Sequence, residues 1–62
     1  MNVTKKNQKF TVSLTPSMKR SKLFEEGVVY VCTEVKIFKG MDNEIYVGDN
    51  WISSEFTTVV KD

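Results

Sequence analysis

The chain has 62 residues, with nine Lys and Arg, eight Asp and Glu, and no histidine. This length accommodates a single domain, and one so small buries only about 60 % of its unfolded surface, so it depends on a well-packed core or on oligomerisation. A lone cysteine excludes an intrachain disulfide, and one thiol among scattered carboxylates excludes an ordinary zinc site. Both a monomer and a homodimer stay open.

The first segment, residues 1–8, is polar and basic, which predicts a flexible basic arm ahead of one β domain over residues 9–62. It lacks the apolar stretch of a signal peptide, and no run approaches the roughly 18 apolar residues of a membrane-spanning helix. Together with the unpaired Cys32, these features predict a cytoplasmic protein without a membrane partner.

Phe10, Val12 and Leu14 alternate with polar residues, which predicts a strand over residues 9–15 with one solvated face. A proline ends this strand, because it lacks the N–H group that a strand ladder uses. Residues 17–22 form a polar, basic connection with room for one helical turn.

The strongest β signal runs over residues 28–38, where apolar side chains occur on both faces. Eleven residues are long for one strand, so a bend is predicted at Thr33–Glu34. A domain of this size cannot build two cores. The second face is therefore covered by residues 16–24, through Met18, Leu23 and Phe24, or offered to a partner.

Short strands are predicted at residues 44–47, 51–52 and 56–60, separated by turns rich in glycine, Asn and Asp. Five short strands without an amphipathic helix predict an all-β fold, either a small closed or half-closed barrel or a strongly bent antiparallel sheet. The expected core consists of Phe10, Val12, Leu14, Val29, Val31, Val35, Ile37, Ile45, Val47, Ile52, Phe56 and Val59.

Two stretches carry a family resemblance. The run from Phe24 to Cys32 resembles the pattern F-x-x-G-x-x-Y-x-C of small phage-encoded proteins, and the stretch from Trp51 to Val59 resembles their closing segment. The resemblance covers residues 23–60 and implies a five-stranded SH3-like β-barrel. It also implies an accessory factor for host takeover, which binds and inhibits a host protein in the host cytoplasm.

Catalytic groups are scarce in this sequence. Without histidine, Cys32 lacks its usual activating base, and its apolar strand favours a buried, inert thiol. Asp42, Glu44 and Asp49 lie near turns but lack the ligand spacing of a calcium loop. We therefore expect no enzyme, no cofactor and no metal site.

Two sets of residues are candidates for binding a partner. The aromatic set favours a protein-interaction module, in which Trp51 is the expected anchor. The segment that carries the basic set contains no acidic residue, and three roles are open for it. It keeps the domain soluble, it docks to an acidic protein or, as the alternative function, it binds nucleic acid while the aromatics stack on bases. The aromatic set is Tyr30, Phe38, Tyr46 and Trp51; the basic set is Lys5, Lys6, Lys9, Lys19, Arg20 and Lys22.

Overall fold

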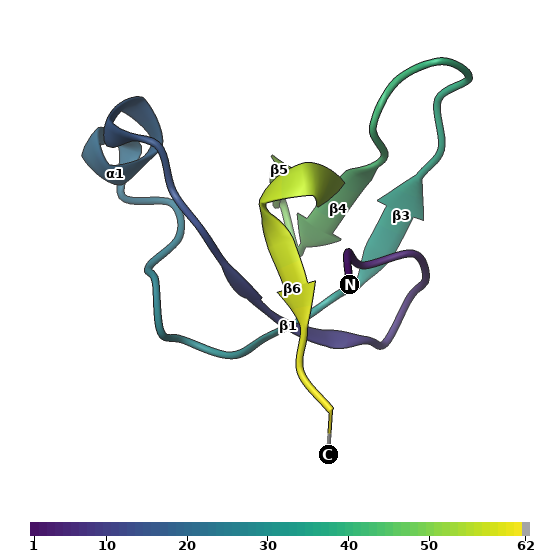
Figure 1. Cartoon of the computed structure of the whole chain (residues 1–62), viewed down its shortest axis with the longest axis horizontal. Coiled ribbons are helices and arrows are strands. Elements are labelled where there is room, and N and C mark those ends of the chain that lie inside the picture. The colour runs from purple at the N-terminus through teal and green to yellow at the C-terminus, as the bar shows by residue number, and fades with distance from the viewer. Residues whose placement is uncertain (62) are drawn as a thin grey trace.

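The computed structural model describes residues 1–61 and consists mainly of short strands in two three-stranded antiparallel sheets, which confirms the all-β prediction (Figure 1). The first sheet has the order β2-β1-β6 and the second the order β3-β4-β5. Within the described residues the strand pairing does not close into a barrel. The elements are β1 (Lys9–Val12), α1 (Pro16–Ser21), β2 (Tyr30–Val31), β3 (Glu34–Lys36), β4 (Glu44–Val47), β5 (Asn50–Ser53), the 3-10 helix η1 (Ser54–Phe56) and β6 (Thr57–Val59).

The chain crosses between the two sheets at two places. The predicted long strand breaks after Val31, so that β2 belongs to the first sheet and β3 to the second. At this break the Thr33 backbone N–H donates to the Tyr46 carbonyl over 2.8 Å, and the Thr33 hydroxyl accepts from the Gly48 N–H over 2.9 Å. The predicted bend near Thr33 is confirmed, and η1 provides the second crossing, from β5 to β6.

The core lies between the two sheets and is small. Phe10 and Val12 of β1 are buried, as are Ile45 of β4 and Ile52 of β5, in agreement with the alternation in the sequence. Partly buried side chains pack around them, in particular Leu14, Met18, Tyr30, Val35, Val47, Phe56 and Val59.

The predicted inner face of residues 28–31 is wrong. Val29 is 51 % exposed and Val31 is 46 % exposed, whereas Cys32 is fully buried. The break at Cys32–Thr33 shifts the alternation, so Tyr30 and Cys32 face inward before it and the odd-numbered Val35 faces inward after it. Beyond the end of β3, Ile37 is 76 % exposed, so its prediction as a core residue is also wrong.

The first eight residues, predicted to be a flexible arm, are mostly exposed but are attached to the first sheet through Met1 and Val3. Val3 is fully buried, and its N–H donates to the Thr57 hydroxyl over 3.0 Å. The Val59 N–H donates to the Met1 carbonyl over 2.7 Å, which covers the outer edge of β6. Val3 thus belongs to the buried core, and its side chain together with these two hydrogen bonds anchors the start of the chain.

The connection from β1 to β2 covers part of the first sheet. It begins with α1, where the Thr15 side chain caps the helix by accepting from the Met18 N–H over 3.3 Å. Phe24 then packs edge-on against Tyr30, with 5.2 Å between ring centroids, and is only 6 % exposed. The prediction that residues 16–24 cover the second face of residues 28–38 is therefore confirmed at Tyr30. Within residues 1–61 no helix combines the length and apolar character that crossing a membrane requires.

Candidate functional site

Trp51 projects from the outer face of the second sheet. The hairpin between β4 and β5 has the two-residue loop Gly48–Asp49, and Gly48 supplies its positive φ of 62°. This loop sets Trp51 opposite Tyr46, and the alternation that buries Ile52 directs Trp51 outward. Trp51 is 50 % exposed and lies on an edge strand, where side chains from two directions can contact it.

One side of Trp51 borders a groove between α1 and the β5–η1 segment, which we call the apolar groove. Its volume is about 270 Å³. Buried Phe24 and Ile52 contribute to its lining, and Leu23, 52 % exposed, borders it together with Trp51. The remaining lining residues are Leu14, Met18, Ser21, Ser53 and Phe56.

The other side of Trp51 borders a second groove, of about 340 Å³, which we call the acidic groove. Phe38 and residues 41–43 form one wall and Glu55 of η1 the other, and the Ser54 N–H joins the walls by donating to the Asn43 carbonyl over 2.9 Å. Its apolar side chains are Phe38, Met41 and Trp51, and its acidic side chains are Asp42, Glu44 and Glu55.

The carboxylates of the acidic groove are close to one another. Desolvation, followed by the charge of the nearby Asp42, raises the pKa of Glu55 above its ordinary value. Glu44 accepts a hydrogen bond from the Tyr46 hydroxyl over 2.8 Å. No lysine or arginine lines this groove, so its negative charges face a cavity without a neutralising cation.

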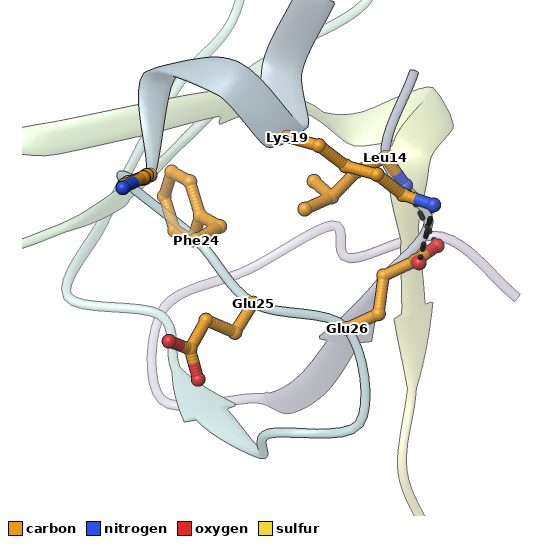
Figure 2. A pocket seen from close by; sticks show the side chains of 6 residues that line it. Leu14, Lys19, Phe24, Glu25 and Glu26 are labelled. Carbon is orange, nitrogen blue, oxygen red and sulfur yellow. Dashed lines mark hydrogen bonds and ion pairs between the residues drawn. The ribbon is translucent and has the colours of Figure 1, made fainter. Parts of the chain in front are cut away.

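A third pocket, of about 460 Å³, lies between α1 and residues 24–26 and shares Leu14 and Phe24 with the apolar groove (Figure 2). Leu14 and Phe24 face each other across it, while Glu25 points away. Glu26 accepts from the Leu14 N–H over 3.1 Å and pairs with Lys19 over 3.3 Å, and these contacts lower the pKa of the Glu26 carboxyl. Since Lys19 and Glu26 are already paired with each other, we assign this pair to holding the β1–β2 connection.

The predicted aromatic set divides in the structure. Phe38 and Trp51 lie together at the acidic groove. Tyr46 is the cross-strand neighbour of Trp51 but is partly covered, with the Lys36 ammonium 5.0 Å from its ring centroid. Tyr30 belongs to the other sheet, where it packs on Phe10 and its hydroxyl accepts from the Glu25 N–H over 2.8 Å, so it is a packing residue.

Sequence reasoning missed two parts of the acidic groove. Met41 lies in a turn, where an apolar residue has no periodic partner that would mark it. Glu55 comes next to Asp42 only because η1 folds back against the loop before β4, a contact between residues 13 positions apart. The one signal in the sequence that could have indicated the acidic groove is the unusual methionine, Met41, in a turn that otherwise consists of glycine, Asp and Asn.

The predicted basic set does not form one continuous patch. Lys5 and Lys6 precede β1, whereas Lys19, Arg20 and Lys22 follow it at α1, and Figure 1 shows these two segments at opposite ends of β1. Lys19 is paired with Glu26, and Lys9 begins β1 between the two groups.

Cys32 has the environment of a packing residue. It is fully buried, and its thiol donates to the Glu34 carbonyl over 3.3 Å. Desolvation raises the pKa of the Cys32 thiol, so the reactive thiolate is disfavoured. Residues 1–61 contain no group of three or more Cys, Asp and Glu side chains placed to hold a metal ion.

The fold and the site together define a small all-β domain with an exposed tryptophan between an apolar and an acidic groove. Comparison of the chain with protein-family models, with curated proteins and with solved structures finds no match in any of the three.

Proposed function

We propose that this domain is a non-catalytic protein-interaction module that binds a partner protein through Trp51 and the two grooves beside it. The observation that carries the proposal is the half-exposed Trp51, which lines both grooves at once. Tryptophan is enriched among the few residues that dominate binding energy at protein interfaces, because it offers a large rigid area with little entropy to lose. The raised pKa of the buried Cys32 thiol supports a role without catalysis.

The resemblance of residues 23–60 to small phage-encoded barrels adds a finer version of this proposal. The partner is then a host protein in the host cytoplasm, and binding inhibits it. The resemblance alone supports these additions, whereas the exposed tryptophan supports the binding role.

Nucleic-acid binding, the alternative function, has less support. A module that follows a phosphate backbone needs a continuous basic face, usually in a clearly basic domain. Here the net charge is +1, the basic residues are divided between residues 1–8 and α1, and three carboxylates line one of the two grooves beside Trp51.

The test is a binding experiment with the immobilised domain and a host lysate, with and without nuclease. Proteins captured by the native domain are identified by mass spectrometry, and the dissociation constant of each purified pair is measured. Trp51→Ala is expected to weaken binding by about 2 kcal/mol or more, roughly thirtyfold, as expected for an interface anchor.

The matched control is Val29→Ala. Val29 is 51 % exposed, as Trp51 is 50 % exposed, but it lies outside both grooves. The control is expected to bind as the native domain does. Equal affinity of Trp51→Ala and Val29→Ala, or capture that nuclease abolishes, would contradict the proposal.

A further inference from the structure

The acidic groove combines two kinds of surface that are seldom left open together. Phe38 is 39 % exposed, Met41 is 73 % exposed and Trp51 is 50 % exposed, so a sizeable apolar area faces solvent. Around it stand the carboxylates of Asp42, Glu44 and Glu55. An apolar partner alone would leave these carboxylates desolvated and without counterions, which is costly.

The described residues supply no cation to this groove. Asp42 lies on one wall and Glu55 of η1 on the other, so like charges face each other across the groove. Lys36, the cross-strand neighbour of Glu44, lies over the Tyr46 ring instead. A cation entering from outside would relieve the repulsion between the two carboxyl groups and would also be attracted to the faces of the aromatic rings.

We propose that the acidic groove binds an arginine or lysine side chain from a segment of the partner protein in which apolar residues flank that cation. Asp42 and Glu55 accept hydrogen bonds from the cation, and Trp51 and Phe38 contact it through their ring faces. This inference rests on the proposed function and specifies the chemistry of the partner.

The position of Trp51 is the reason that we expect apolar residues on either side of the cation in the partner segment. Because Trp51 lines both grooves, a segment that places its cation in the acidic groove passes over Trp51 into the apolar groove. There the apolar groove, bordered by Leu23, offers space to an apolar side chain. Phosphate groups are disfavoured, because they would meet three carboxylates.

The first experiment follows amide and indole signals of the ¹⁵N-labelled domain by NMR while acetyl-Leu-Arg-Leu-amide is added. A second titration uses the same peptide with citrulline, which keeps the shape of arginine but carries no charge. The Trp51 indole and the amides of residues 38–43 and 54–56 are expected to shift with the arginine peptide. The citrulline peptide is expected to bind about five- to tenfold more weakly, the effect of one charge on exposed carboxylates and rings.

The second experiment compares two double variants of equal net charge. Asp42→Asn with Glu55→Gln removes two carboxylates from the groove, whereas Glu25→Gln with Asp49→Asn removes two from outside it. The groove variant is expected to lose the preference for arginine over citrulline, and the control to keep it. Both variants must first show the dispersed spectrum of a folded domain.

Three results would overturn the inference: no shift at Trp51, equal binding of the two peptides, or equal loss in both double variants. Shifts of the same signals on simple concentration of the domain would assign the groove to a second copy and overturn it as well. The proposed function fails separately, since it requires only that Trp51→Ala weakens the partner. If Trp51→Ala weakens the binding of a partner but the groove variant does not, the proposed function stands and the inference that the acidic groove binds a cation is wrong.

Discussion

Thr57 joins three separate parts of the chain through one hydroxyl group. Its oxygen accepts from the Val3 N–H over 3.0 Å and its O–H donates to the Ser54 carbonyl over 2.7 Å. Thr57 is 2 % exposed, so water cannot replace either partner. A single polar atom thus fixes both the start of the chain and the turn that follows Trp51.

Replacing Thr57 by valine is expected to destabilise the domain by about 1–3 kcal/mol, because it leaves the buried Val3 N–H without a partner. The Ser54 carbonyl keeps its bond from the Thr57 backbone N–H and loses only the bond from the hydroxyl. The urea-unfolding midpoint measures the effect. Thr58→Val is the control, since Thr58 is exposed and the shape change is the same. Equal midpoints for the two variants would show that the Thr57 hydroxyl has no such role.

The β1–β2 connection depends on Glu26. This carboxylate contacts Lys19 of α1 and the Leu14 backbone N–H just after β1, and both contacts favour its charged form. The pKa of Glu26 in the folded domain is therefore below 4.5, its value without these contacts. Its contribution to stability is fully present above that value and is lost as pH falls through the depressed folded pKa.

Glu26→Gln is accordingly expected to lower the melting temperature at neutral pH by a small amount, since the group is exposed. The difference from the native domain is expected to shrink as pH falls below 4.5. Melting curves over a pH series measure this. A difference that stays constant with pH would show that the charge of Glu26 does not contribute.

At the same scale, the sequence predicted which segments form strands better than which faces they bury. Alternation located β1, β4 and β5 and the bend near Thr33. It could not decide whether Val29 and Val31 or Tyr30 and Cys32 face inward, because both sets are apolar and a period of two gives them equal weight. The structure selects the second set, because Tyr30 packs against Phe10 and Phe24 and Cys32 is fully buried, contacts that depend on the whole fold.

A comparison of Val3 with Val31 directly tests which side chains the core buries. Val3→Ala removes a fully buried side chain and is expected to cost about 2 kcal/mol. Val31→Ala, at a position 46 % exposed, is expected to change stability by less than about 0.5 kcal/mol. Chemical denaturation of both variants measures the two values. If Val31→Ala destabilised the domain more than Val3→Ala, the predictions of a flexible arm and of Val31 in the core would be right.

For the whole molecule, the small core leaves apolar side chains on two separate surfaces. Val28, Val29 and Val31 lie along one, and Trp51 with Phe38 lies on the other. The candidate site was predictable in part: Trp51 directly follows a tight turn and Phe38 precedes one. Its acidic character was not, because Asp42 and Glu55 meet only through the packing of η1 against the loop before β4.

The central claim is that Trp51 is open to solvent in the free domain and covered when the partner binds. Trp51 is the only tryptophan of the chain, so intrinsic fluorescence reports on this residue alone. Acrylamide quenching is expected to be efficient in the folded domain at every protein concentration, and to fall when the partner is added. Strong protection of Trp51 in the free folded domain would contradict the claim, because the fold or a second copy would then already cover it.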